Sequence, residues 1–400
     1  MPTFAYTPLL SYEDDGLVRP TQVVVDLDAL ADNLAAIRRR VGARQVMPIL
    51  KANAYGHGLV PVARLMEHLG VDYIGVAVLE EGILLRQAGI RTPILVLGGI
   101  WGNQIPLFLK YDLTLTASSV EKLEQIDQAA AALGVTAKVH LKIDTGMERI
   151  GVHYYSATPF LEASLRCRHV QVEGIFSHFA NADAADLGSA RQQLARFQEV
   201  LSFYEKRSLP APMRHMANSA AILRLPEAFF DLVRPGILLY GVYPSAEVPR
   251  SVAVRPALTW KSRVVYFKVT QPGHPVSYGW TWAPQRLTRI VTVPVGYGDG
   301  YFRAMSNKAH VLIRGRRYRQ VGRICMDQMM VNLEWGTAYN GDEVVLIGQQ
   351  GEERITAEDL AAWAGTIAYE VLTNINTRVP RRYVSQRYDV QRLVQPPVLE

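Results

Sequence analysis

Lys51 lies at the end of an apolar run, a position from which its amine could take part in a reaction. The five residues before it, Val46–Leu50, are all apolar, and a glycine-containing loop with Tyr55, His57 and Gly58 follows. An apolar run of this length predicts a buried strand that delivers Lys51 at its end. Burial disfavours a charged amine, so lysine is seldom buried unless it is paired or functional. The alternative, a lysine that extends from a strand edge into solvent, is the more common arrangement.

Four later apolar runs also end in polar or charged residues. These runs contribute Lys142, Asp144 and Arg149 from LKIDTGMERIG, His178 from FSHFANAD, His215, Asn218 and Ser219 from HMANSAA, and Arg234, Gly236 and Ile237 from VRPGILLYG. Guanidinium groups match carboxylates and phosphates, and free N–H groups and hydroxyls at a helix start suit a phosphate. These residue types therefore point to an anionic ligand.

Each of these residues also has an ordinary explanation. Asn218 and Ser219 precede a short helical stretch and could simply cap it. Arg234 could form an ion pair, and so could Lys142 with Asp144. The two histidines, taken alone, would be core or rim residues.

The elements that must position these residues alternate between short apolar runs and helical patterns. The helical stretches include Ala29–Arg40, Leu59–Leu69, Val120–Leu133 and Ala190–Lys206. The apolar runs are Val46–Leu50, Ile74–Val78, Pro93–Leu97, Leu113–Thr116, Lys138–Ile143, Val172–Phe176, Met213–Met216 and Leu232–Leu239. Eight buried strands alternating with helices predict a (β/α)8 barrel, in which functional side chains lie at the C-terminal ends of the strands.

The pattern changes near residue 255, where strand-like segments follow one another without helices. These segments are Trp260–Val269, Thr288–Val295, His310–Arg314, Gln328–Leu333 and Glu343–Ile347. They predict a mostly antiparallel β domain, with one late helix, Leu360–Ala368, after a capping box at Thr356.

The predicted fold class is therefore α/β, with an N-terminal barrel followed by a β domain. We expect an N-terminal extension over 1–20, the barrel over 21–254 and the β domain over 255–400. The first strand, Thr21–Leu27, is followed by Asp28 as a helix cap. This strand is not needed for the eight of the barrel and could join the β domain.

Composition excludes several other classes of protein. The 400 residues are 49% hydrophobic and 20% charged, as in globular proteins, and the net charge of +6 is spread too thinly to indicate nucleic-acid binding. Cys167 and Cys325 are far apart and support neither a disulfide nor a zinc site, so we expect no metal. No signal peptide and no run of roughly 18–20 apolar residues is evident, which predicts a cytoplasmic protein.

The segment KANAYGHG, Lys51–Gly58, closely resembles the cofactor-lysine segment of alanine racemases. The four strand-end segments above resemble motifs of the same family, as do HPVSYGWTW, VPVGYGDG and VGRICMDQ, and the resemblance extends from about Val23 to Arg382. It implies that Lys51 holds pyridoxal 5'-phosphate as a Schiff base. The implied reaction interconverts L- and D-alanine and supplies D-alanine for peptidoglycan.

The resemblance also implies roles for individual residues around the cofactor. The phosphate contacts would be Tyr55, Asn218, Ser219, Gly236 and Ile237, and the ring contacts Leu97, His178 and Arg234, with His215 bonded to Arg234. Arginine cannot accept a proton, so it would leave the pyridine nitrogen neutral. The cofactor would then be a weaker electron sink, which limits side reactions.

Racemisation needs a second base opposite Lys51, and Tyr278 matches the catalytic tyrosine of the family. A free tyrosine titrates near 10, so its site must tune it. Substrate-binding and supporting positions match at Arg149, Tyr297, Cys325, Met326, Asp327, Lys142, Arg303 and Arg323, with Lys142 a candidate for carbamylation that would orient Arg149. In the family the tyrosine comes from the partner subunit, which implies a homodimer with shared sites.

The sequence departs from the family at Thr377, where some members carry a tyrosine that touches the phosphate and the entrance. Three alternatives stay open. One is a racemase of serine or of several amino acids, because a methyl and a hydroxymethyl differ by only about 1–3 kcal/mol. Another is a decarboxylase of the same architecture, although VSYGW and GRICMDQ resemble racemase segments. The third is a non-catalytic pyridoxal-phosphate carrier, which typically lacks the second domain.

Overall fold

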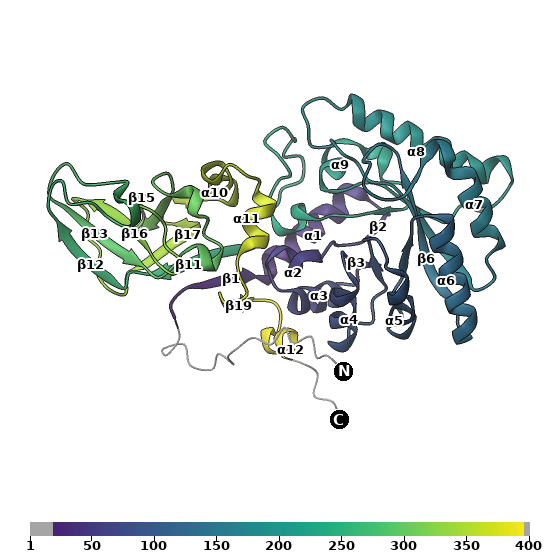
Figure 1. Ribbon diagram of the computed structural model, residues 1–400, viewed down its shortest axis with the longest axis horizontal. Helices are drawn as coiled ribbons and strands as arrows, with labels where there is room; N and C mark the ends of the chain where they lie inside the picture. The colour runs from purple at the N-terminus through teal and green to yellow at the C-terminus, as the bar shows by residue number, and fades with distance from the viewer. Residues whose placement is uncertain (1–18, 396–400) are drawn as a thin grey trace. The chain divides into compact units, whose positions relative to one another are not determined.

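The computed structural model describes residues 19–395, which divide into two compact units (Figure 1). The barrel unit comprises Ala29–Ala54, Leu59–Arg255 and, at the end of the described chain, Gln391–Gln395. Among the described residues, the β unit comprises Arg19–Asp28, Tyr55–Gly58 and Pro256–Val390. Most of the predicted N-terminal extension lies outside the described residues.

The barrel unit is built on eight parallel strands that close into a ring. The strands are β2 (Gln45–Val46), β3 (Ile74–Val76), β4 (Ile94–Val96), β5 (Leu115–Ala117), β6 (Ala137–Asp144), β8 (Val170–Phe176), β9 (Met213–His215) and β10 (Leu232–Val233). Six of them pair in the order β2-β10-β9-β8-β6-β5, and β3 pairs with β4. Single parallel bridges, Ile49 to Gly75 and Leu95 to Thr114, complete the ring. The predicted barrel is therefore confirmed.

Helices alternate with the strands of the barrel. They are α1 (Leu27–Val41), α3 (Leu59–His68), α4 (Leu79–Gln87), α5 (Ile105–Lys110), α6 (Val120–Leu133), α7 (Ala157–Arg166), α8 (Gly188–Lys206) and α9 (Ser219–Arg224). Helix α6 shows why such segments fold: it buries Leu123, Ile126 and Ala130 on one face. Ser119 caps its start and Gly134, in the left-handed conformation, ends it.

The β unit is organised around one mostly antiparallel sheet in the order β12-β13-β16-β15-β14-β17-β11-β1-β19, with β18 beside β17. Its strands are β1 (Gln22–Asp26), β11 (Leu258–Arg263), β12 (Tyr266–Thr270), β13 (Thr288–Val293), β14 (His310–Ile313), β15 (Arg316–Val321), β16 (Met329–Glu334), β17 (Glu343–Gln350), β18 (Glu353–Ile355) and β19 (Arg381–Val384). Strand β1 pairs antiparallel with β11 and parallel with β19. The first strand therefore belongs to this sheet.

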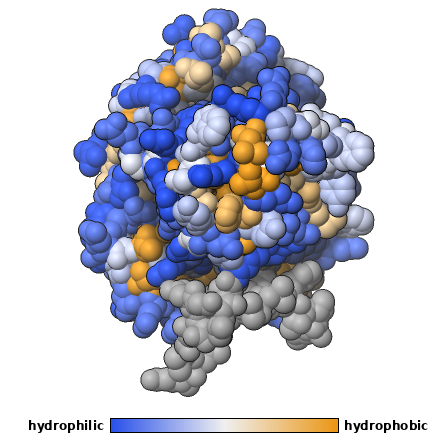
Figure 2. Space-filling view, turned by 90° about the vertical axis from the view of Figure 1, so that its left-hand side faces the viewer, coloured by the Kyte–Doolittle hydropathy of each residue, from blue (hydrophilic) through white to orange (hydrophobic). Residues whose placement is uncertain are grey.

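The outer strand β12 leaves Tyr266, Phe267 and Val269 partly exposed around Lys268. Figure 2, which faces the side where β12 lies in Figure 1, shows small apolar patches in a mostly hydrophilic surface. A lysine on an edge strand opposes pairing with another strand.

Among the described residues no helix combines the length and apolar character needed to cross a bilayer.

The predicted strands Trp260–Val269 and Leu232–Leu239 do not continue as the sequence indicated. The predicted strand Trp260–Val269 is two strands, because β11 pairs with β17 whereas β12 pairs with β13. The predicted strand Leu232–Leu239 ends at Val233, and Ile237–Tyr240 forms a 3-10 turn. Pro235 lacks the N–H that would continue the ladder.

Two helix boundaries also differ from prediction. Helix α1 begins before Asp28, whose carboxylate accepts from Ser385 Oγ and Gln386 N instead of capping the helix. The late helix is two: α10 (Ala357–Ala364), capped by Thr356, and α11 (Ala368–Asn374). Gly365 at φ 76° ends α10, as a left-handed glycine commonly does.

Asn33 on α1 joins that helix to two later segments of the barrel unit, and the contribution of this contact to stability can be tested. Its buried side-chain amide donates to Leu239 O and Arg255 O, both at 2.9 Å, and accepts from Arg255 N. Because Asn33→Ala leaves these backbone groups without partners, we expect it to lower the free energy of unfolding by about 2–4 kcal/mol in urea titrations. Asp32→Ala, which removes an exposed ion pair with Arg255, should cost less than about 1 kcal/mol. Equal losses would contradict this account.

Candidate active site

Lys51 directly precedes an unusual left-handed turn in the segment that follows the first barrel strand. The next three residues have φ and ψ near 50°: Ala52 (53°, 53°), Asn53 (55°, 46°) and Ala54 (53°, 51°). This conformation costs an L-residue roughly 1–2 kcal/mol. Three hydrogen bonds hold it: Ala54 N to Leu50 O at 2.7 Å, Leu59 N to Asn53 Oδ1 at 2.8 Å, and Ala52 N to a carboxylate oxygen of Glu81 at 2.6 Å.

The Lys51 amine lies in a site that disfavours its charge. Burial lowers the pKa of Lys51, the charge of Arg149 lowers it further, and Glu81 opposes the shift. A lysine with a lowered pKa has more of the neutral amine, which is the form that acts as nucleophile or base. The ordinary alternative, an amine that extends freely into solvent, does not describe this residue.

Arg234 is buried, and its guanidinium is held from several sides. Nη1 donates to His215 Nδ1 at 2.8 Å, and Nη2 lies 2.7 Å from Ser177 O, 3.1 Å from Met216 O and 3.2 Å from His178 Nδ1. Burial lowers the pKa of Arg234 to about 9. Nε–H and one Nη1–H have no acceptor within residues 19–395, so they are available to a ligand. Among residues 19–395, Arg234 does not form the ion pair with a carboxylate that was the alternative from the sequence.

The imidazole of His140, which the sequence did not indicate as a functional group, lies beside that of His215. His140 Nδ1 lies 2.8 Å from His215 Nε2, and both rings are fully buried. Because Arg234 donates to His215 Nδ1, His215 must carry its proton on Nε2 and donate it to His140. Burial and the charge of Arg234 lower the pKa of His140 to about 3 and that of His215 well below its ordinary value. Both rings are therefore neutral.

Lys142 is buried on β6 beside the same arginine. Its Nζ donates to Ile143 O at 2.9 Å and lies 5.2 Å from the centre of the Phe176 ring. Burial, followed by the charge of Arg234, lowers the pKa of Lys142 to about 7. The alternative of an ion pair with Asp144 is not formed, because that carboxylate is engaged elsewhere.

Asp144 shapes the loop that carries Arg149. Oδ1 accepts from Gly146 N at 2.7 Å and Met147 N at 3.0 Å, and Oδ2 accepts from Arg149 N at 3.2 Å. These bonds lower the pKa of Asp144 against the effect of its burial. The exposed Arg149 side chain makes no hydrogen bond to any described residue, which leaves its fork free for a carboxylate.

Residues after β9 and β10 bring several polar groups together. Asn218 Oδ1 accepts from Ala221 N at 3.0 Å and caps α9, as the simpler interpretation expected. Ser219 Oγ accepts from Gly236 N at 2.9 Å and from Leu238 N at 3.3 Å. Since a hydroxyl has two acceptor positions and one donor, the Ser219 O–H is left to donate to an anion.

The other predicted cofactor residues differ in burial. Ile237 is fully buried after Gly236, His178 and Leu97 are half-buried, and Tyr55 is buried with its ring 6.1 Å from that of Tyr369. Burial lowers the pKa of His178 well below its ordinary value, and the charge of Arg234 adds to the effect. Tyr55 belongs to the β unit.

In the β unit, Tyr278 lies on an exposed turn of irregular backbone. Its side chain is 70% exposed, between Ser277 at φ 68° and Gly279 at φ 68°. Ser277 Oγ donates to Arg323 O at 2.6 Å and lies 3.6 Å from Cys325 Sγ. The turn that carries Tyr278 is thus tied to the segment that carries the predicted residues Arg323 and Cys325.

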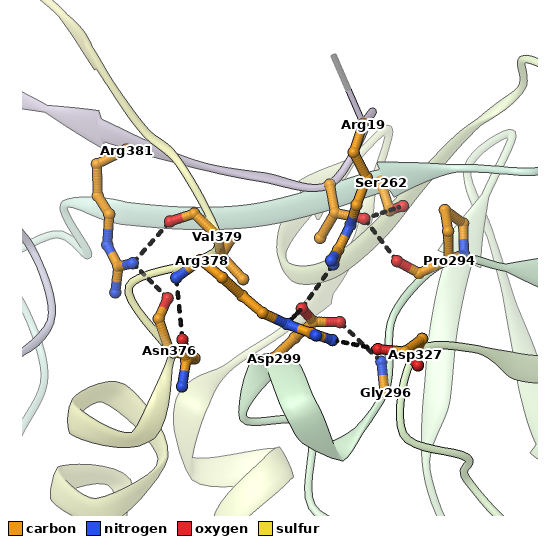
Figure 3. A network of polar contacts seen from close by, with 11 residues as sticks. Arg19, Ser262, Pro294, Gly296, Asp299, Asp327, Asn376, Arg378, Val379 and Arg381 are labelled. Carbon is orange, nitrogen blue, oxygen red and sulfur yellow. Dashed lines mark hydrogen bonds and ion pairs between the residues drawn. The ribbon is translucent and has the colours of Figure 1, made fainter. Parts of the chain in front are cut away.

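Asp299 is the centre of a charged network in the same unit (Figure 3). Its buried carboxylate lies 2.6 Å from Arg19 and 2.7 Å from Arg378, and Arg378 also reaches Asp327 at 2.7 Å. Asp299 Oδ2 further accepts from Gly296 N at 3.0 Å. The network fixes the turn that carries Tyr297.

That turn is bonded directly to the neighbouring predicted segment. Tyr297 N donates to Cys325 O at 3.0 Å and Gly298 N to Met326 O at 2.9 Å. Tyr297 and Met326 are both exposed, and so is Arg303 in the next turn. The described residues include no group of His, Cys, Asp or Glu suited to hold a metal ion.

Comparison with known proteins identifies the family. The models "Alanine racemase, N-terminal domain" and "Alanine racemase, C-terminal domain" match residues 25–244 and 257–383. The chain is 46% identical over 369 residues to the alanine racemase of Carboxydothermus hydrogenoformans, covering 92% of this chain and 100% of that one. The chain belongs to the alanine racemase family.

Solved alanine racemases have the same fold as this chain. The enzyme from D-cycloserine producing Streptomyces lavendulae has a TM-score of 0.89 at 38% identity, covering 94% of this chain and 100% of that one. The enzyme from Bacillus anthracis with bound L-Ala-P has a TM-score of 0.86 at 36% identity, covering 92% and 96%. As in alanine racemases generally, an α/β barrel is followed by a β domain.

The neutral histidines of this alanine racemase family member predict a dependence of stability on pH. The folded pKa of His140, about 3, lies below the roughly 6.5 of an unfolded histidine, so unfolding binds a proton between these values. Its contribution is complete above about pH 6.5 and is lost as the pH falls. Between pH 7 and 5 we expect the loss to be about 2 kcal/mol smaller in His140→Gln than in the wild type.

Urea unfolding at the two pH values measures this difference. His274→Gln, which changes an exposed histidine, should keep the wild-type dependence. If His140→Gln lost as much stability as the wild type between pH 7 and 5, His140 would not be the neutral, buried ring described.

Proposed function

We propose that this chain is a pyridoxal-phosphate-dependent alanine racemase that interconverts L- and D-alanine. The observation that carries this proposal is the set of basic groups at the ends of the barrel strands. The Lys51 amine has a lowered pKa and faces the charge of Arg149, and Arg234 is held by His215. The family membership and the L-Ala-P bound to the Bacillus anthracis enzyme support alanine as the substrate.

The residues present fit pyridoxal 5'-phosphate. Lys51 would hold its aldehyde carbon, and the free O–H of Ser219 and the backbone near Gly236 would contact its phosphate. Leu97 and His178 would contact its ring, with Tyr55, Asn218 and Ile237 completing the set that the resemblance implies. The cationic surroundings suit a phosphate, which carries negative charge. Bound pyridoxal phosphate withdraws electrons from the α-carbon of the amino acid and so acidifies its proton.

Arg234 would face the pyridine nitrogen with an N–H that has no other acceptor. A guanidinium is fully protonated at neutral pH even at a pKa of about 9, so it donates and does not deliver a proton. His215, itself oriented by His140, fixes the guanidinium in place. This arrangement favours proton transfer alone over reactions that need a stronger electron sink.

Two groups would move the α-proton. Lys51 takes or returns it on the D-alanine side, because its lowered pKa makes the neutral amine available. Tyr278 does the same on the L-alanine side. Arg149 binds the substrate carboxylate, together with Tyr297, Cys325, Met326 and Asp327, and Arg303 and Arg323 support them.

Lys142 would be carbamylated. At a pKa of about 7 a large share of its amine is neutral at physiological pH. A neutral amine attacks CO2, forms an N–C bond and releases a proton, which leaves an anionic carbamate. The negative charge would relieve the repulsion among Lys142, Arg149 and Arg234 and would orient Arg149.

The active enzyme would be a cytoplasmic homodimer in which Tyr278 enters the site of the partner chain. The high exposure of Tyr278 agrees with a role toward a second molecule. The product D-alanine would serve peptidoglycan synthesis.

The division of labour between the two bases can be tested by α-proton exchange in D2O, followed by NMR. We expect Tyr278→Phe to lower racemisation about 10²–10⁴-fold while D-alanine still exchanges its α-proton through Lys51. Lys51→Ala should lose both activities and the visible absorbance of the bound cofactor. Tyr266→Phe, another exposed tyrosine of the β unit, is the control and should stay active. Normal turnover in Lys51→Ala would reject the proposal.

Sharing of sites between chains predicts complementation between two inactive variants. If Lys51→Ala and Tyr278→Phe are unfolded together and refolded in equal amounts, half of the dimers would be mixed. Each mixed dimer would have one site with both bases intact, so we expect about a quarter of the wild-type activity. Mixtures that stay inactive, although mass spectrometry detects the mixed dimer, would contradict a site built from two chains.

A further inference from the structure

Glu81, in the first turn of α4, binds backbone amides from the ends of two neighbouring strands. One carboxylate oxygen accepts from Ala52 N at 2.6 Å, and the other accepts from Ala77 N at 2.9 Å. Ala52 directly follows Lys51, and Ala77 directly follows β3. The carboxylate therefore ties the segment that carries Lys51 to the end of the adjacent strand.

Only one of these two contacts has an ordinary explanation. Helix α4 has no side-chain cap at Val78, and a glutamate in the first helical turn often reaches back to an amide just before its helix. That accounts for the bond to Ala77. The bond to Ala52 crosses to a different element and meets the first residue of the left-handed turn. Residues held in such a conformation persist only where their surroundings fix them.

Glu81 also acts on the Lys51 amine through its charge. Arg149 from the loop after β6 and Glu81 from α4 act on the amine through their charges, and the charge of Lys51 in turn lowers the pKa of His178. Of these groups Glu81 is the anionic one. It raises the pKa of Lys51, whereas burial and Arg149 lower it.

We propose that Glu81 is a positioning residue for Lys51, which fixes the backbone that carries the lysine and supplies the negative charge facing its amine. The inference rests on the proposed function in so far as Lys51 is the catalytic base. The link that it predicts between Glu81 and the position and protonation of Lys51 does not depend on the substrate.

The chain offers a matched set of variants. Glu81→Gln keeps the length of the side chain but removes its charge and one acceptor. Glu81→Asp keeps the charge but is too short to reach both amides. Glu80→Gln makes the same change of charge at the next residue, which is exposed and has no hydrogen bond or ion pair within residues 19–395.

The first readout is the chemistry of Lys51 in the full-length protein after removal of pyridoxal phosphate. Acetylation by acetic anhydride as a function of pH, read by peptide mass spectrometry, follows the neutral amine. We expect the midpoint for Lys51 to move to lower pH in Glu81→Gln, because the charge that favours the ammonium is gone. It should stay near the wild-type value in Glu81→Asp and Glu80→Gln.

The second readout is hydrogen exchange at the Ala52 amide. It should be slow in the wild type and in Glu80→Gln, and faster in Glu81→Asp, which cannot span both amides. In the enzyme with cofactor bound, we expect kcat of Glu81→Gln to fall about tenfold or more, since small displacements of a catalytic group are costly. The pH profile of kcat should shift as well.

A Lys51 midpoint that is the same in Glu81→Gln and Glu80→Gln would overturn the inference. Rapid exchange of the Ala52 amide in the wild type would also overturn it, even if the Glu81 variants failed to fold. If the wild type showed no racemisation, the proposed function would fail, while the acetylation midpoints would still decide the role of Glu81.

Discussion

Basic side chains gather at the C-terminal ends of the barrel strands, and burial penalises the charge of Lys51, Lys142 and Arg234 there. Lys51, Lys142, Arg149 and Arg234 act on one another or on the neighbouring histidines through that charge. A site of this kind is unfavourable until negative charge enters it. Its chemistry depends on that imbalance, because the Lys142 amine becomes partly neutral and the His140 ring stays neutral, while the Arg234 guanidinium keeps its proton. An anionic cofactor and a substrate carboxylate would neutralise the excess of positive charge.

Because His215 and His140 are neutral, each hydrogen bond from Arg234 to His215 and on to His140 has a fixed donor and a fixed acceptor. With the Nδ1 of His215 accepting from Arg234, its other nitrogen must donate to His140. A charged imidazole in either place would turn an acceptor into a donor and oppose the arginine. Burial of both rings therefore does more than pack the barrel: it selects the one protonation state in which the guanidinium is held.

The sequence predicted the eight barrel strands, the change to a β domain and the strand ends that carry chemistry, because apolar runs and their polar ends are local features. It did not predict the left-handed turn after Lys51, since Ala52, Asn53 and Ala54 have no residue-type signal for it apart from the asparagine. His140 was also missed, because its role depends on contact with His215, 75 positions away in the chain. Periodicity marked His140 only as a residue within a strand.

The carboxylates nearest to these basic groups are engaged by backbone amides and not by lysine. Asp144 accepts from three amides of its own loop, and Glu81 from two at neighbouring strand ends. Within the described chain neither Lys51 nor Lys142 has a carboxylate within ion-pair distance. A direct ion pair would hold the ammonium form and remove the lysine from proton transfer. Anchoring each carboxylate on N–H groups instead lets it shape the backbone while its charge acts on the lysine only from a distance, so that geometry and basicity are set by the same residue.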